Sequence, residues 1–191
     1  MFSPEDTARS PRLFFALLPD AAARGDLDAL ARELARETGG KAVPAANVHL
    51  TLAFLGPVPR DRLAQIEAIG AAAAQGAAAF DVALDRVGHF RAARVAWAGQ
   101  APTHAALQRL FDRLRTELAS AGLPAEQRPF HPHATLARHC RRPPADMPWP
   151  GTRWRAEALA LMASETLPGG ARYRAVASWP LAAHAAAAAS S

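Results

Sequence analysis

The segment VHLTLAFLG at residues 48–56 and the segment HATLAR at residues 133–138 share the pattern His-x-Thr-Leu-Ala, in which x is apolar. This alternation of polar and apolar residues is typical of a β-strand, where successive side chains point to opposite faces. His49 and Thr51 then lie on one face, while Leu50 points the other way into the core. We therefore predict two strands that each present an imidazole and a hydroxyl on rigid backbone.

Apolar periodicity and turn residues around the two segments predict the remaining elements. Strands are expected over residues 12–18, 48–55, 133–137, 154–162 and 172–179, a hairpin over 80–87 and 94–99, and helices over 20–38, 60–74 and 103–121. This order is not a regular βαβ repeat, and it favours an α+β fold with antiparallel sheet and helices outside. Because the two motifs lie in different halves of the chain, we expect a bilobal molecule with pseudo-twofold symmetry.

The composition bounds the class of protein. Half of the 191 residues are hydrophobic, so a sizeable core can form. We interpret residues 12–180 as one bilobal domain, preceded by a disordered leader, 1–11, and followed by a low-complexity tail, 181–191. The single cysteine, Cys140, excludes an intrachain disulfide and a Cys-x-x-Cys zinc site, and it fits a reducing compartment. We find neither a signal-peptide h-region nor a membrane-length apolar run, and we expect a cytoplasmic monomer with no membrane partner.

The charge of the chain indicates anionic partners. Arginine and lysine together number 22 against 17 acidic residues, for a formal charge of +5, and Lys41 is the only lysine. Arginine presents a planar fork of donors that suits phosphate, although coding bias also produces arginine-rich chains. The surroundings of Lys41, KAVPAAN, do not match those of the attacking lysine in a nucleotidyl-transferring ligase.

Two His-x-Thr strands facing each other across a cleft are suited to a cyclic phosphodiester. One neutral histidine takes a proton from the attacking water, and the other, protonated, gives a proton to the departing ribose oxygen. The ordinary pKa of histidine lets both forms exist near neutral pH. Thr51 and Thr135 then donate hydrogen bonds to the non-bridging oxygens. This scheme needs no metal and no cofactor, and it assigns His49 and His133 as the catalytic pair.

These motifs resemble those of the 2H phosphoesterase superfamily, and most closely its branch of RNA 2',3'-cyclic phosphodiesterases, which are also called 2'-5' RNA ligases. The resemblance runs from RLFFALLP at residues 12–19 through HLTLAFLG to PFHPHATLAR, and more weakly to SETLPGGARYR. It implies two antiparallel sheets that form a concave cleft. It also implies that RNA ends or nucleotides with a 2',3'-cyclic phosphate are hydrolysed to 2'-phosphomonoesters, with His49 as the acid, His133 as the base and 2'-5' ligation as a reversible side of the reaction.

Arg138 and Phe130 are the candidate substrate-binding residues. The resemblance implies that Arg138 contacts the phosphate or ribose, but strict alternation points it away from His133, so the strand must bulge or end, or the side chain must curl around the edge. Phe130 precedes the motif strand and is a candidate to stack on a nucleobase, as is Tyr173. Other side chains are interpreted as structural: Phe14, Phe15 and Phe54 as core, His131 and His139 as cleft rim or loop, and His89 and His104 as surface.

Two other functions remain open at this stage. The first is a non-catalytic RNA-binding module of the same fold that uses arginines on phosphate. The second is a metal-dependent phosphodiesterase, to which His131 and His133 could contribute, although no third ligand is evident near them.

Overall fold

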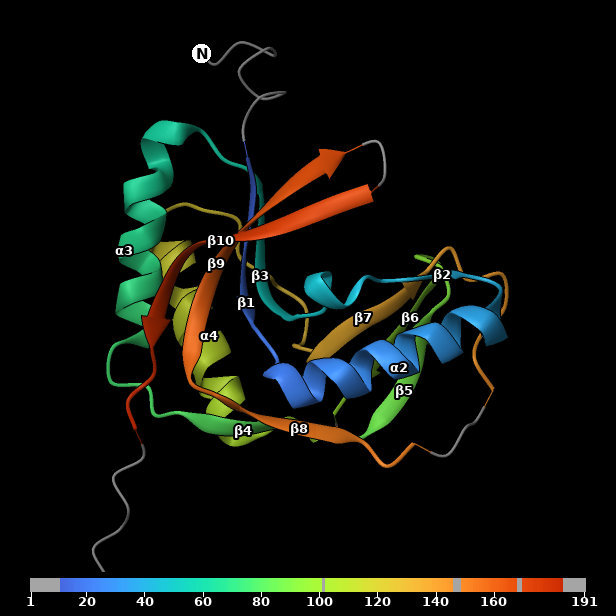
Figure 1. Ribbon diagram of the computed structural model, residues 1–191. Helices are drawn as coiled ribbons and strands as arrows, with labels where there is room; N and C mark the ends of the chain where they lie inside the picture. Colours follow the sequence, from blue (N-terminus) through green and yellow to red (C-terminus); the bar gives the residue numbers. More distant parts are fainter. Residues whose placement is uncertain (1–10, 101, 146–148, 168–169, 184–191) are drawn as a thin grey trace, which may run out of the picture.

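The computed structural model describes residues 11–100, 102–145, 149–167 and 170–183 (Figure 1). Most of the predicted leader and tail therefore lies outside the described residues. The elements, in chain order, are β1 (Arg12–Leu17), α2 (Ala21–Thr38), β2 (Lys41–Ala42), η1 (Ala45–Asn47), β3 (Leu50–Pro57), η2 (Arg60–Arg62), α3 (Leu63–Ala74), β4 (Phe80–Leu84), β5 (Arg86–Phe90), β6 (Val95–Gly99), α4 (Ala105–Ser120), β7 (His133–Arg138), β8 (Thr152–Ala156), β9 (Ala158–Leu167) and β10 (Gly170–Pro180).

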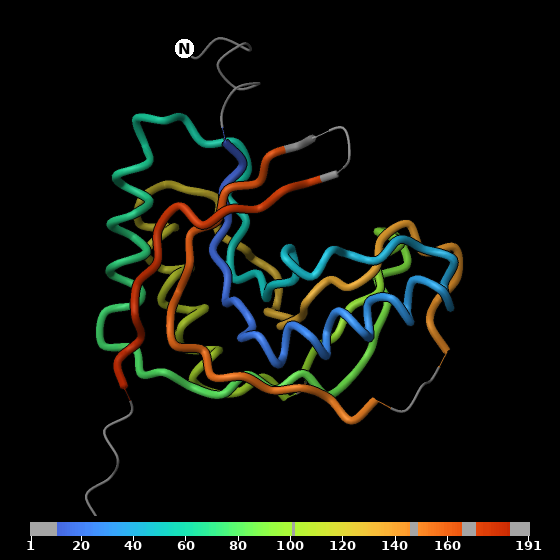
Figure 2. Tube along the Cα trace, viewed as in Figure 1, coloured from blue at the N-terminus to red at the C-terminus, as the bar shows by residue number. Residues whose placement is uncertain are grey.

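The main sheet is antiparallel and has the strand order β10-β9-β1-β3-β7-β6-β5, with β2 added to β7. Its first lobe, β10-β9-β1-β3, meets its second lobe, β7-β6-β5, through the single residue pair Leu50–Ala134. A second sheet contains only β4 and β8. In Figure 2 the orange β9 runs beside β1 in blue, and the red β10 lies on the far side of β9. The predicted α+β fold with antiparallel strands is confirmed.

The three helices cover one face of the main sheet. α3 packs against β9 and β10 and α4 against β3, both in the first lobe, whereas α2 packs against β7 in the second lobe (Figure 1). α2 begins and ends as predicted, because the Asp20 side chain accepts from the Ala23 amide and Gly39 adopts a left-handed φ of 66°. The predicted apolar stripe of α4 is buried.

The predicted hairpin over residues 80–87 and 94–99 is wrong in its first strand. β4 leaves the main sheet and pairs with β8, and the observed hairpin joins β5 to β6. The predicted strand 154–162 is likewise divided, because β8 pairs with β4 whereas β9 pairs with β1 and β10. Alternating apolar residues predict strands in these segments, but they do not indicate which other strand each one pairs with.

The folded chain continues past residue 180. Leu181 is buried, and Ala182 forms a bridge with Ala78. Cys140 is a buried free thiol. Within the described ranges, no helix is both long enough and apolar enough to cross a membrane.

Candidate active site

The two His-x-Thr motifs meet where the lobes of the sheet join. Leu50 and Ala134 are paired and fully buried, so the residues that flank them point to the opposite face, which we call the histidine face. Extending this antiparallel register by one residue on each side sets His49 opposite Thr135, and Thr51 opposite His133. All four side chains are half-buried. The structure thus brings the four predicted motif residues into one cluster.

His49 is held by its backbone and by two aromatic rings. Its Nδ1 lies 2.7 Å from the Asn47 carbonyl oxygen, and the Asn47 side chain donates in turn to the Ala171 carbonyl at 2.6 Å. Because a carbonyl only accepts, Nδ1 carries the hydrogen and Nε2 is left to act on a substrate. Phe14 and Tyr173 flank the ring, with centroids at 4.7 and 5.2 Å.

His133 repeats this arrangement in the second lobe. Its Nδ1 lies 2.6 Å from the His131 carbonyl oxygen, which again leaves Nε2 free. Phe90 stands edge-on to the ring at 5.0 Å, and Trp97 lies 6.1 Å away. The Trp97 ring lies so close over Gly88 that an added Cβ there would fall 2.1 Å from it. The pseudo-twofold symmetry therefore extends to how each imidazole is oriented and enclosed.

The environment lowers the pKa of both histidines. Burial is the main cause for each, and the hydrogen bond to the backbone carbonyl acts in the opposite direction. The positive charge of Arg138 lowers the pKa of both His49 and His133, and the charge of His133 lowers that of His49 further. The two imidazoles and the guanidinium therefore share one electrostatic site.

Arg138 reaches this site through a bulge in β7. The register between β6 and β7 shifts between Thr135 and Ala137, so that Leu136 is the extra residue. Leu136 and Ala137 are both buried, and the exposed Arg138 returns to the face of His133. One of the alternatives expected from the sequence, a bulge before Arg138, is observed.

A cleft of about 860 Å³ opens beside Thr51 and His133. Phe130 lies in its wall and stacks on the buried Phe111, with ring centroids 4.1 Å apart. His131 also lines the cleft and is exposed, whereas His139 follows β7 with a left-handed φ of 57°. Phe130 thus lines the same cleft as Thr51 and His133.

Comparison with known proteins agrees with this geometry. The model of the 2'-5' RNA ligase superfamily matches residues 18–167, which include both His-x-Thr segments. The chain belongs to this superfamily. The resemblance to 2H phosphoesterases that the motifs predict is thereby confirmed.

Relatives of this superfamily member match it over most of its length. The RNA 2',3'-cyclic phosphodiesterase of Escherichia coli is 33% identical, covering 89% of this chain and 96% of the relative, and that of Thermus thermophilus is 33% identical over 85% and 86%. Among solved structures, E. coli LigT complexed with 3'-AMP has a TM-score of 0.77 at 31% identity, over 91% of this chain and 99% of the other. Another, described as a phosphoesterase, has a TM-score of 0.81 at 31% identity and the same coverage.

Sequence reasoning missed the enclosure of the histidines and misplaced one aromatic residue. Phe14, Phe90 and Trp97 carry no local signal, because only the strand order brings them to the imidazoles. Phe54, interpreted as core, is 52% exposed and lines the cleft. A register shift between β1 and β3 leaves Leu52 as the extra residue, which turns Phe54 onto the histidine face.

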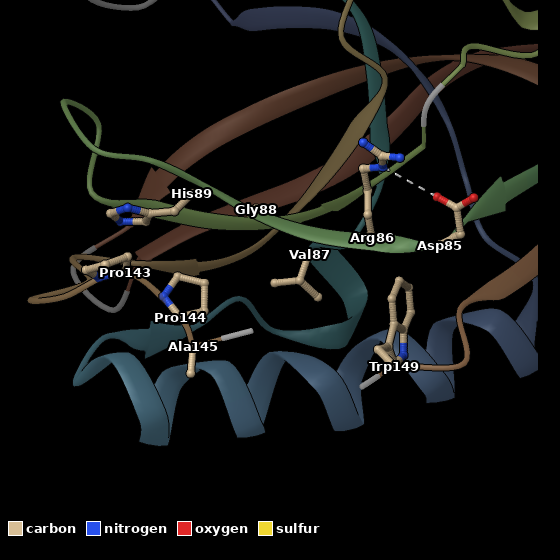
Figure 3. A pocket seen from close by; sticks show the side chains of 9 residues that line it. All are labelled: Asp85, Arg86, Val87, Gly88, His89, Pro143, Pro144, Ala145 and Trp149. Atoms are coloured by element: carbon tan, nitrogen blue, oxygen red, sulfur yellow. Dashed lines mark ion pairs between the residues drawn. The ribbon is translucent and has the colours of Figure 1, made fainter. Parts of the chain in front are cut away.

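A smaller cavity of about 400 Å³ lies on the other side of β5 (Figure 3). Val87, Pro144 and Trp149 line it, and alternation along β5 separates it from Phe90 and the histidine face. His89, expected in a surface turn, lies in β5 with both ring nitrogens buried and without a partner. In the part of the chain that the structure describes, no three or more His, Cys, Asp or Glu side chains are grouped to hold a metal ion.

Proposed function

We propose that this protein hydrolyses 2',3'-cyclic phosphate ends of RNA to 2'-phosphomonoesters, with His49 and His133 as a paired acid and base. The observation that carries the proposal is the pair of symmetrically held imidazoles, each with Nδ1 bound to a carbonyl and Nε2 free. The names of the E. coli and T. thermophilus relatives support the reaction, and the 3'-AMP complex of E. coli LigT supports a nucleotide ligand.

The proposed reaction is an in-line displacement at phosphorus. Nε2 of neutral His133 takes a proton from water as the water oxygen attacks, and the bond between phosphorus and O3' breaks. Nε2 of protonated His49 gives its proton to O3', which leaves as a hydroxyl. The phosphate stays on O2'. An RNA 5'-hydroxyl in place of water would yield a 2'-5' linkage by the same steps.

The remaining site residues stabilise the negative charge of the phosphate and position the substrate. The hydroxyls of Thr51 and Thr135 flank the imidazoles and donate to the non-bridging oxygens, where negative charge builds up. Arg138 neutralises the phosphate from the bulged end of β7. Phe130, at the wall of the cleft, packs against the base of the reacting nucleotide.

The lowered pKa values fit the role of His133 as the base in the free protein, and a bound substrate changes the pKa values of both histidines. Burial keeps His133 neutral near neutral pH, as a base requires. The bound phosphodiester then brings a negative charge between the imidazoles, which raises the pKa of both. The bound substrate thereby favours a state with one protonated imidazole, and in the proposed scheme His49 carries that proton.

Product analysis on a short RNA that ends in a 2',3'-cyclic phosphate tests this function. We expect a 2'-phosphate product that forms undiminished after exhaustive chelation, and rates at least ~100-fold lower for the His49→Ala and His133→Ala variants. RNA binding without turnover by the wild type would favour the non-catalytic module instead. Activity lost on chelation and restored by a divalent cation would favour the metal-dependent phosphodiesterase.

A further inference from the structure

Two positively charged side chains lie next to each other at one end of the motif cluster. Lys41 on β2 is paired directly with Arg138 on β7, and the two strands lie side by side in Figure 1. Directly paired residues of antiparallel strands point to the same face, so Lys41 shares the histidine face with Arg138. Both residues are exposed. We call Lys41 and Arg138 the cation pair.

The charges of the cation pair are not neutralised within the ranges that the structure describes. None of the ion pairs formed there includes Lys41 or Arg138. The neighbouring Arg94 differs, because its Nε donates to the Cys140 carbonyl at 3.1 Å. Like charges directly opposite each other on paired strands destabilise a sheet. Two such charges on the face of the histidines therefore indicate a site for an anion.

The cation pair and the cleft lie at opposite ends of the motif cluster. Thr51 and His133 line the cleft and form one end. Thr135 comes next along β7, and two residue steps on β6, roughly 7 Å, separate its partner from the partner of Arg138. A ligand that reaches from the cleft to the cation pair must therefore pass over the histidines.

Within the cation pair, Arg138 is the residue that acts on the histidines. Its charge lowers the pKa of both His49 and His133, whereas the charge of Lys41 is a cause of neither shift. Arg138 thus serves the reacting phosphate, as proposed above, and Lys41 lies farther from the histidines. This position leaves Lys41 available for a second anionic group.

We propose that Lys41, beside Arg138, binds the 5'-phosphate of the reacting nucleotide, so that the preferred substrate carries a phosphate on each side of its ribose. The proposal rests on the proposed function. In a ribose, C1' with the base and C4' with the 5' carbon lie on opposite sides of the ring oxygen. A nucleotide with its base in the cleft and its 2',3' edge at the histidines therefore directs its 5'-phosphate toward the cation pair.

The chemistry of lysine suits this phosphate. An ammonium is a compact charge on a flexible stem, whereas a guanidinium is a rigid fork that favours one bidentate geometry. Lys41, the only lysine of the chain, can therefore follow a phosphate whose position varies with the nucleotide. It also suits both sources of the group, the monoester of a free nucleotide and the diester that joins the last two nucleotides of an RNA.

The test compares three substrates in wild type and Lys41→Ala. They are a nucleoside 2',3'-cyclic phosphate, the same compound with a 5'-phosphate, and a dinucleotide that ends in a 2',3'-cyclic phosphate. Lys41→Ala should lower kcat/KM roughly 5- to 10-fold for the second and third, between the loss of an exposed ion pair and that of a charge-assisted hydrogen bond, and leave the first within about 2-fold. A loss on the second alone supports the subsite for free nucleotides, and a loss on the third alone supports it for RNA.

Two further variants separate the subsite from general effects of charge. Lys41→Arg keeps the charge and should retain the preference for the 5'-phosphate. Arg153→Ala removes one exposed charge from β8, in the other sheet, and should change none of the three values. Equal losses on all three substrates in Lys41→Ala, or no loss on any, would overturn the proposal.

The outcome stays separable from the proposed function. Turnover of none of the substrates by the wild type would reject the hydrolysis itself. Calorimetric titration with adenosine 2'-phosphate and adenosine 2',5'-bisphosphate would then decide the subsite. Weaker binding of the bisphosphate alone in Lys41→Ala supports it, and equal effects on both ligands, or none on either, overturn it.

Discussion

Gly88→Ala should loosen the second lobe around His133. A Cβ at residue 88 would lie 2.1, 2.3 and 2.6 Å from three atoms of the Trp97 ring, far inside van der Waals contact, so Trp97 must move. Overpacking of this kind costs about 1–3 kcal/mol of unfolding free energy. For a chain of this length that corresponds to a decrease of about 2–12 °C in Tm.

Gly88→Ala should also change the pKa of His133. Burial is the largest cause of its lowered pKa, and Trp97 lies 6.1 Å from its ring. Displacing Trp97 admits water, so the pKa of His133 should rise toward its ordinary value, while that of His49, enclosed by other rings, should not. Thermal unfolding and the NMR titration of the two imidazoles measure both effects.

Two comparisons make this prediction specific. Gly25→Ala meets no atom within 4 Å on an exposed turn of α2, and it should raise stability by about 0.5–1 kcal/mol. In a Trp97→Phe background the smaller ring leaves space, so Gly88→Ala should cost less. An unchanged Tm and an unchanged His133 titration in Gly88→Ala would refute the role given to Trp97.

Three further outcomes are expected. Thr51→Val and Thr135→Val should each lower kcat by about 2- to 10-fold, the loss of one neutral hydrogen bond, and a loss as large as that of a histidine variant would assign the hydroxyls another role. Arg138→Ala should raise KM for cyclic phosphates and reduce the salt dependence of kcat/KM, and an unchanged salt dependence would place Arg138 away from the phosphate. The folded state holds the pKa values of His49 and His133 below the ordinary value of about 6.5, so the unfolded chain binds more protons than the folded chain below that pH. The free energy of unfolding should therefore be highest above about pH 6.5 and decrease as the pH falls through the lowered pKa values. A free energy of unfolding in urea that does not change over this pH range would contradict the burial of both rings.

The motif strands were predictable because their signal is local. A His-x-Thr pattern on alternating sequence places both polar side chains on one face whichever strands lie beside it, and Leu50 and Ala134 are buried as that pattern requires. The helices were predictable for the same reason: a cap at Asp20 and a left-handed Gly39 act on the residues next to them.

The partners of the strands were not predictable from local patterns. β4 carries the alternation of a hairpin strand, but its pairing with β8 is a contact between distant segments. The exposure of Phe54 also depends on a neighbour, since the bulge at Leu52 is defined only by the register with β1. Pairing and bulges are settled by packing across the whole sheet.

The most direct test of the paired-histidine mechanism uses a leaving group that needs no proton. A 2',3'-cyclic substrate with sulfur in place of the bridging O3' releases a thiolate, because a thiol has a far lower pKa than a ribose hydroxyl. kcat/KM is measured for His49→Ala and His133→Ala on this analogue and on the normal substrate. We predict losses of at least ~100-fold for both variants on the normal substrate, with recovery on the analogue for His49→Ala alone. Near wild-type activity of either variant on the normal substrate, or recovery of both on the analogue, would contradict an acid and a base acting on one phosphorus.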